Sequence, residues 1–346
     1  MVSWIIVFVA LLLSALWAGM FLRQLRSGLT HTALEDHFTW GLYVQGFFFF
    51  SALAGGILIF MAVATLFEVT SVRPLVEIGS AAALGCLAAA GLLLGSDLGK
   101  PFRGIKIVTG KNFASPLTWD FYMLSLCGVL DLLFLLGLVP QKGSLAIGWA
   151  VLCLLATLGY VMIHTLFFLS RVGAGFRSQP FLGLDTLAQS LWGGMALMNL
   201  IALASGLTIQ HTGGILLALS CLTLIPLAGA HIATLTLKSR EMEQKRIIAL
   251  DAFILVVLAL IVMAAPENQG FLAVMSILIL VAVFLEKSHL MRQYQTKPTL
   301  PLPYSRYEET PEYSPTASEW VLALGSVGVC VFSSTLIINL KALLWG

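Results

Sequence analysis

Residues 41–67 read GLYVQGFFFFSALAGGILIFMAVATLF and contain no charged side chain. About 20 apolar residues in helical form cross a bilayer core, so this stretch predicts a transmembrane helix. The whole chain of 346 residues is similar, being 59% hydrophobic and only 10% charged, with a mean hydropathy of +0.95. A soluble domain is nearer half apolar and a quarter charged, which excludes that class. No basic stripe is interleaved with aromatic residues, so nucleic-acid binding is not expected.

Cutting the chain at charged or Gly/Pro-rich breaks predicts about ten transmembrane helices and an all-α membrane protein. The first run lacks a basic segment before it, so it reads as a retained span rather than a signal peptide. Residues 186–237 are uncharged and too long for one helix, and we divide them at the hairpin near 206–214. The predicted spans are 3–22, 41–67, 78–96, 117–138, 145–170, 186–207, 213–237, 247–264, 271–285 and 320–340.

The basic residues predict the direction of the spans. Of the 19 lysines and arginines, all but Arg73, Lys142 and Lys341 fall in the loops that follow odd-numbered spans. Cytoplasmic loops carry the excess of basic residues in membrane proteins. We therefore expect a multi-pass protein of the cytoplasmic (inner) membrane, with the odd-numbered loops in the cytoplasm and both termini outside.

Carboxylates inside the spans are the first candidates for chemistry, because burying a charge in a membrane is costly. Asp131 follows Asp120 by eleven residues, which brings both onto one face of the fourth helix, roughly 16 Å apart along its axis. Glu68 and Glu77 lie at the far ends of neighbouring spans. Together these four predict a proton path running inward from the odd-loop side, while simple packing of a hydrogen-bonded carboxyl is the alternative.

Two histidines lie at matching depth, two turns inside the odd-loop face. His164 precedes Arg171 by seven residues, and His231 precedes Lys238 by seven. Tyr160 lies one turn from His164 on the same side of its helix. A histidine there can bind a quinone carbonyl and exchange its proton near neutral pH; a structural histidine and an axial haem pair are the alternatives.

Cysteine usage argues against metal sites and disulfides. The five cysteines lie inside apolar runs and none forms a CxxC pair, so we interpret them as small packing residues. The cysteines thus predict no disulfide, structural zinc site or iron–sulfur cluster in this chain.

Two motifs flank the second and fourth spans. Trp40 and Tyr43 stand where the second span begins, in WGLYVQGFFFFSALAGG, a position where aromatic residues often mark the membrane interface. The third loop carries SDLGKPFR and then SPLTWD, a charged turn stiffened by prolines. Its Asp97, Lys100 and Arg103 suit the docking of a protein or an anionic head group, or they set topology alone.

These motifs together resemble the polysulfide-reductase (NrfD/PsrC) type of integral membrane subunit. The matching motifs cover residues 40–125, and the DLG(K/R)PxR and SPxxW pair is the more specific part. The family commonly has glycine after the SPxxW tryptophan, where this chain has Asp120, so the site at this helix mouth differs. Many relatives also dock their iron–sulfur partner outside the cytoplasmic membrane, whereas the charge distribution here turns the docking face inward.

The resemblance implies an architecture of two four-helix bundles, spans 2–5 and 6–9, plus flanking first and last helices. Asp120 and Asp251 would then occupy similar starts of the fourth and eighth spans. Within a single membrane domain, 1–346, we expect five parts. They are a first helix and loop at 1–39, a first bundle at 40–184, a second bundle at 185–285, a Pro-rich loop at 286–319 and a last helix at 320–346.

The resemblance also implies a function. Such subunits are haem-free, quinone-reactive anchors beside a four-cluster ferredoxin-like iron–sulfur subunit and, commonly, a molybdopterin catalytic subunit. We therefore expect a quinone-binding anchor of a respiratory oxidoreductase, non-catalytic alone, using menaquinone and with proton translocation as an added role. A haem-b cytochrome-type anchor and a secondary transporter using buried carboxylates are the alternatives. The expected residues are Trp40, Tyr43, Tyr160, His164 and Asp120 for quinone; Asp131, Glu77, Glu68, His231 and Asp251 for protons; and Asp97, Lys100 and Arg103 for docking.

Overall fold

Every regular element that the computed structural model describes is a helix. It describes residues 4–35, 38–110, 112–140, 142–169, 182–204, 268–295 and 313–345. Within these ranges eight helices are long and apolar enough to cross a membrane. They are α1 (Trp4–Ser27), α2 (Leu42–Leu66), α3 (Arg73–Asp97), α5 (Pro116–Leu135), α6 (Ser144–Leu169), α7 (Leu182–Ala204), α10 (Gln269–Gln295) and α11 (Ala317–Trp345). The predicted seventh and eighth spans, 213–237 and 247–264, lie outside the described residues.

The helix ends agree within four residues for four spans and differ more for the other four, of which α1 runs to Ser27 rather than ending at 22. Helix α3 begins at Arg73 rather than at 78, because Pro74 suits the first turn of a helix. Helix α10 runs to Gln295 rather than ending at 285, so the predicted Pro-rich loop is shorter at its start. Its charged residues Glu286 and Lys287 are buried by protein, and they therefore do not end the helix. Helix α11 is also longer than the predicted 320–340.

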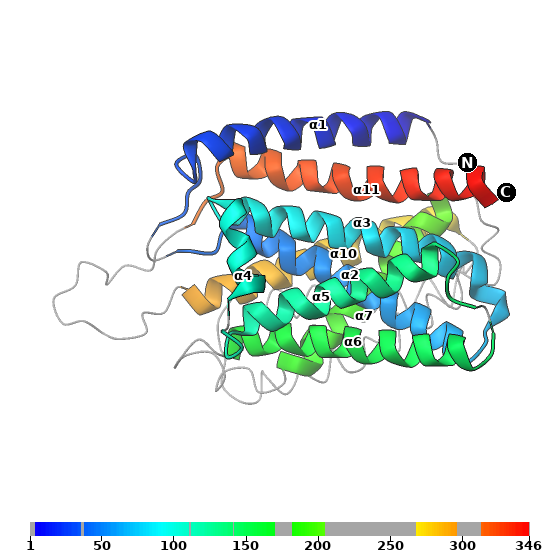
Figure 1. Ribbon diagram of the computed structural model, residues 1–346. Helices are drawn as coiled ribbons and strands as arrows, with labels where there is room; N and C mark the ends of the chain where they lie inside the picture. The colour runs from blue at the N-terminus through cyan, green and yellow to red at the C-terminus, as the bar shows by residue number, and fades with distance from the viewer. Residues whose placement is uncertain are drawn as a thin grey trace.

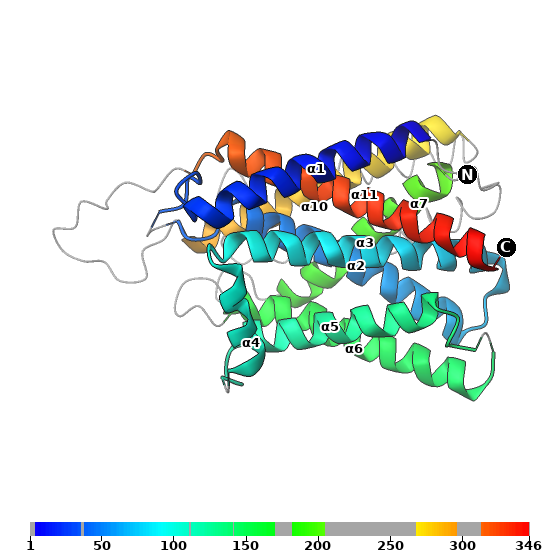
Figure 2. The ribbon, with the colours of Figure 1, turned by 45° about the horizontal axis from the view of Figure 1, so that its top comes forward.

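Helices α2, α3, α5 and α6 form a four-helix bundle. Helix α2 packs against α3 and α6, and α5 closes the ring by packing against the same two helices (Figure 2). These are predicted spans two to five, so the first of the expected bundles is confirmed. Helices α7 and α10 pack against each other and against α2, and they are the part of the second bundle that the described residues include.

The first and last helices flank the bundle. Helices α1 and α11 run side by side in opposite directions, and α11 also packs on α3 (Figure 1). Only 11% of the apolar window of α1 is buried, against 89% for α2. The exposed apolar side chains of α1 therefore suit contact with lipid, whereas α2 is the buried centre of the protein.

A backbone contact joins α2 to α7. A Cβ atom on Gly194 would stand 2.7 Å from the Cα of Gly56 and from the backbone nitrogen of Ile57. Apolar packing against lipid tails is no weaker than packing against another helix, so membrane helices associate through close contact between small residues. This glycine pair lets the two groups of helices meet along their backbones.

The loops gather at two opposite ends of the molecule. Residues 28–35 and 38–41, η2 (Pro101–Gly104) and α4 (Ile105–Thr109) lie at one end, which we name the odd-loop end (Figure 1). The turn with η1 (Thr70–Val72) and residues 136–140 lie at the other, the even-loop end. Helix α1 begins and α11 ends at the even-loop end, and the third loop is structured as predicted.

Candidate functional site

A histidine and an aspartate meet inside the first bundle. The Nε2 atom of His164 on α6 lies 3.1 Å from Oδ1 of Asp120 on α5, and the side chains are 2% and 3% exposed. Helix α5 begins after Ser115, and Pro116 occupies its first turn, where the fixed φ of proline suits a helix. This start sets Asp120 in the second turn, on the face that looks into the bundle.

Aromatic rings surround the His164 imidazole. Tyr160 contacts it edge to face with ring centroids 4.7 Å apart, and Phe48 and Phe47 do so at 4.8 and 5.7 Å. The Tyr160 hydroxyl is buried, and its polar neighbour among the described residues is the Ser51 side chain of α2. The predicted placement of Tyr160 beside His164 is confirmed, and the cluster combines apolar rings with a few polar atoms.

Aromatic contacts lead from this pocket to the odd-loop end. The ring centroids of Trp40 and Phe167 are 4.8 Å apart, and those of Phe167 and Phe48 are 5.7 Å apart. Gln295 at the end of α10 holds Trp40 in place. It accepts a hydrogen bond from the Trp40 backbone N–H at 2.7 Å and donates its amide to the Trp40 carbonyl at 2.9 Å. The sequence did not single out Gln295, because the predicted helix ended ten positions earlier.

Tyr43 belongs to a hydrogen-bonded chain that ties three helices together. Its hydroxyl donates to Oε1 of Gln24 on α1 at 3.1 Å, and Gln24 donates its amide to the Ser96 carbonyl on α3 at 2.5 Å. Ser96 directly precedes the motif residue Asp97. The Tyr43 ring is 1% exposed. The first helix thereby fixes both the start of α2 and the third loop.

The turn before α2 is held by the segment that precedes α11. The backbone N–H of Leu42 donates to the Tyr313 hydroxyl at 2.7 Å, and that hydroxyl donates to Glu319 at 2.5 Å. Thr316 and Glu319 form a reciprocal capping box at the start of α11. Burial, and then the Glu319 carboxylate, raise the pKa of Tyr313 above its ordinary value, so it stays a donor at neutral pH. Gly41 has no room for a Cβ, which would lie 2.5 Å from this hydroxyl.

The third loop presents both charge and apolar surface at the odd-loop end. Lys100 is exposed, while Asp97 has a buried Oδ1 atom without a hydrogen-bond partner among the described residues. Phe102 and Ile105 are 86% and 66% exposed. The loop contributes to a hollow of about 410 Å³ beside Gly28 and Leu29.

Asp131 lies deeper in the same bundle, beyond Asp120 on α5 as expected. It is completely buried and accepts a hydrogen bond from Ser80 on α3. Glu68 and Glu77 are found at the even-loop end, where they line one cavity. The structure therefore brings Asp120 to His164, and Glu68 to Glu77, but keeps the two pairs at opposite ends. His231 and Asp251 lie outside the described residues, as does the side chain of Arg103.

Sequence reasoning missed a second group of buried polar residues. Glu286, Lys287 and His289 on α10 are 5%, 2% and 6% exposed, and Asp185 on α7 interacts electrostatically with Lys287. Ser288 donates to Gln45 on α2 at 3.0 Å. Helical spacing continues through 286–295 and is the available signal, whereas the charges there predict the start of a loop.

The fold and this site define a polytopic helical membrane protein with a buried histidine–aspartate pair in a four-helix bundle. A family profile described as "Polysulphide reductase, NrfD" matches residues 30–298, and the chain belongs to that family. The resemblance drawn from the motifs is thus confirmed.

The chain is also similar to a protein whose name describes it as a membrane subunit of a reductase. The chain is 28% identical over 217 residues to a Halobacterium salinarum protein whose name describes it as a membrane subunit of dimethyl sulfoxide reductase. The match covers 56% of this chain and 49% of the relative, so the chain spans about half the length of the curated relative it matches.

Proposed function

We propose that this chain is the quinone-binding membrane anchor of a multi-subunit respiratory oxidoreductase. It passes electrons between a partner iron–sulfur subunit and the quinone pool, with menaquinone as the quinone. The observation that carries this proposal is the His164–Asp120 pair, 3.1 Å apart and enclosed by aromatic rings, with the buried Tyr160 hydroxyl beside it. The head group of a quinone is a flat apolar ring with two carbonyls. It needs a site in which aromatic side chains contact the ring and a few polar groups orient the carbonyls.

The residues divide the chemistry between them. Reducing a quinone to a quinol takes two electrons and two protons, and oxidising the quinol returns them. Asp120 lies 3.1 Å from Nε2 of His164, so it fixes the imidazole and exchanges its proton, and the other ring nitrogen of His164, Nδ1, faces a carbonyl. The Tyr160 hydroxyl supplies a second hydrogen-bonding group for the quinone. The rings of Trp40 and Tyr43 line the way to the pocket. The chain itself binds no haem or metal in this proposal, so the electrons come through a partner.

The partners follow from the family and from the odd-loop end. The relative's name calls it a membrane subunit of a reductase. We propose a four-cluster ferredoxin-like iron–sulfur subunit as the direct partner and a molybdopterin subunit as the catalytic one. Asp97, Lys100 and Arg103 order the docking loop, and the exposed Phe102 and Ile105 add apolar contact area. A reduced-minus-oxidised spectrum of the purified chain with a haem Soret band would contradict the haem-free assignment.

We place the odd-loop end in the cytoplasm. The basic residues of the odd-numbered loops support this placement under the positive-inside rule. A fluorescent protein fused within residues 241–245 should be bright, and alkaline phosphatase fused at Gly346 should be active. The reverse pattern, a phosphatase active at 241–245 and a bright fluorescent protein at 346, would put the iron–sulfur partner outside.

Proton transfer accompanies the quinone reaction in this proposal. Asp120, Asp131, Glu77 and Glu68 carry it through the first bundle, and His231 and Asp251 belong to an equivalent route in the second. The support is that intramembrane carboxylates are costly and most often functional. Asp131 is the strongest case, because it is fully buried near the far end of the bundle.

Quinone binding can be tested at Tyr160. Tyr160→Phe removes only the buried hydroxyl beside Ser51 and keeps the ring, so a soluble quinone analogue should bind the purified complex roughly tenfold more weakly. Isothermal titration calorimetry measures the Kd. Tyr122→Phe is the matched control, since Tyr122 is half-buried near the same end of α5 but outside the aromatic pocket. Equal weakening in both variants, or in neither, would remove Tyr160 from the site.

A further inference from the structure

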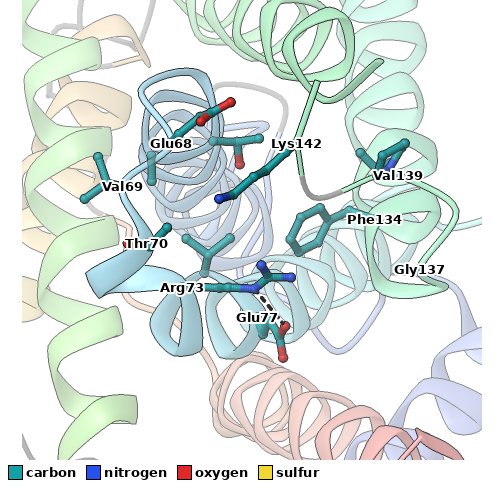
Figure 3. Close-up of a pocket in the computed structure, with 13 residues that line it drawn as sticks. Glu68, Val69, Thr70, Arg73, Glu77, Phe134, Gly137, Val139 and Lys142 are labelled. Atoms are coloured by element: carbon teal, nitrogen blue, oxygen red, sulfur yellow. Dashed lines mark ion pairs between the residues drawn. The ribbon is translucent and has the colours of Figure 1, made fainter. Parts of the chain in front are cut away.

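A charged cavity opens at the even-loop end of the first bundle, opposite the His164–Asp120 pair. Its volume is about 250 Å³, and it lies between the end of α2, the start of α3 and the end of α5. Arg73 and Glu77 form an ion pair of 3.8 Å across one helical turn, while Glu68 and Lys142 extend from the two turns that border the cavity (Figure 3). The space has room for several water molecules, each of which occupies about 30 Å³ in the liquid.

Four charged side chains line this cavity, at the end of the molecule whose loops otherwise carry few basic residues. Arg73 and Lys142 are two of the three basic residues outside the odd-numbered loops, and both line this one cavity. Glu68 ends α2 with φ of 50°, the left-handed region that favours glycine. Its N–H bonds the Thr65 carbonyl, and the next N–H, of Val69, bonds the Ala64 carbonyl. Glu68 therefore places a carboxylate at a backbone position that glycine would adopt with less strain.

Asp131 lies about one helical turn below the cavity. Val76 and Glu77 line the cavity on α3, and Ser80, three residues beyond Glu77, is roughly 5 Å deeper along the helix. Phe134 lines it on α5, and Asp131 is three residues before Phe134. Ser80 donates to Oδ1 of Asp131, whereas Oδ2 is buried without a hydrogen-bond partner among the described residues. This carboxylate is therefore next to the cavity and keeps one oxygen available.

Polar side chains continue from Asp131 toward the histidine. Along α6, Cys153, Thr157, Tyr160 and His164 follow at helical spacing, and each is at most 1% exposed. Thr157 donates to the Cys153 carbonyl at 2.7 Å, so the Cys127 thiol of α5 is the donor in its 3.6 Å contact with Thr157.

These buried polar groups form a column within the first bundle. Cys127 and Cys153 are close enough to Asp131 to interact with it electrostatically, and Ser51 of α2 interacts with Tyr160. The column runs inside the bundle from the cavity to the His164–Asp120 pair.

We propose that the cavity is the mouth of a proton pathway that connects the even-loop face, through Asp131 and this column, to the His164–Asp120 pair. This inference rests on the proposed quinone function and assigns the face at which its protons are exchanged. Each proton enters from water in the cavity, passes to Asp131 and reaches the pair. Two protons and two electrons from the partner convert one quinone to one quinol, and the reverse flow releases the protons at the cavity.

The test plugs the cavity from outside. In Lys142→Cys the new thiol lines the cavity, and a bulky membrane-impermeant methanethiosulfonate reagent should close it. Ser144→Cys receives the same group two residues away, outside the lining. The complex is reconstituted into liposomes with a pH dye at the even-loop face. Labelled Lys142→Cys should exchange protons there roughly tenfold more slowly, with quinone turnover slowed to match because each quinone needs two protons, while labelled Ser144→Cys keeps the unlabelled rate. Equal proton exchange in both labelled variants would overturn the proposal.

A second arm tests the pathway without relying on the plug. Asp131→Asn keeps an acceptor for Ser80 but cannot carry a proton, so it should reduce proton exchange at the even-loop face by a similar factor. A fluorogenic thiol dye, which reacts when the buried cysteines become exposed, reports whether the variant is folded. An unchanged rate of proton exchange in folded Asp131→Asn would assign Asp131 to packing and overturn the pathway.

Failure of the pathway is distinguishable from failure of the quinone function. Proton flux driven by a potassium diffusion potential with valinomycin needs no turnover, and the plug and Asp131→Asn should lower it as well. A complex that shows no turnover with any quinone analogue, but a proton flux that the plug blocks, would refute the quinone proposal alone. Normal quinone turnover, with a proton flux that neither the labelled Lys142→Cys nor Asp131→Asn lowers, would refute only the assignment of the cavity as the mouth of the pathway.

Discussion

Replacing His164 by alanine should lower quinone-coupled turnover of the complex by roughly 10²- to 10⁴-fold, the usual contribution of a positioned acid–base group. His164 is 1% exposed, lies 3.1 Å from Asp120 and is enclosed by three aromatic rings. Its loss removes the group that meets the quinone carbonyl and leaves a buried carboxylate without its partner. Steady-state turnover with a soluble quinone analogue, measured on the purified complex, checks the result.

Two variants separate this role from a structural one. Asp120→Asn keeps the shape of the side chain and removes its charge, so turnover should fall by roughly 10- to 100-fold and its pH profile should shift. His31→Ala changes a half-buried histidine of the first loop, at the same end of the molecule, and should leave turnover within a factor of about two. Unchanged turnover in His164→Ala, with the partner subunits still bound, would refute the placement of the quinone.

Gly194→Ala should destabilise the protein strongly. The new Cβ would lie 2.7 Å from backbone atoms of Gly56 and Ile57, and neither helix backbone can move as a flexible side chain can. Overpacking of this kind costs about 1–3 kcal/mol, and more where backbones collide. Thermal unfolding followed with a fluorogenic thiol dye measures the change, because Cys86, Cys127, Cys153 and Cys330 are buried in the folded protein.

Gly148→Ala is the matched control on α6. A Cβ there meets no atom within 4 Å, so the variant gains only the better helix propensity of alanine, about 1 kcal/mol. The two identical substitutions should therefore change the unfolding temperature in opposite directions. A similar shift for both would show that the contact between α2 and α7 does not limit stability.

The long apolar runs and the positions of the charges determined the class of this protein from sequence alone. Residues 41–67 predicted α2 to within one residue at each end, because a span is bounded by what a bilayer excludes. The motifs after Trp40 and around Asp97 were sufficient to indicate the family. The inward face shared by Asp120 and Asp131 also followed from helical periodicity, and both are buried in the structure.

Charge misled the sequence interpretation where protein rather than lipid surrounds a helix. The run from Glu286 to Arg292 looked like a loop, yet α10 continues through it to Gln295. Hydropathy measures compatibility with lipid, and it gives no information about a helix end buried against α2 and α7. For the same reason the link from Gln295 to Trp40 was not predictable.

Only the tertiary structure decided which distant residues meet. His164 and Asp120 were separate candidates on different spans, and the antiparallel packing of α5 and α6 brings them to 3.1 Å. Tyr43 meets Gln24, and Leu42 meets Tyr313, 271 positions away. Periodicity assigns a face to each helix but does not state which faces pack together or at what height. That pairing depends on side-chain volume and close backbone contacts such as Gly56 with Gly194, which exist only in the folded bundle.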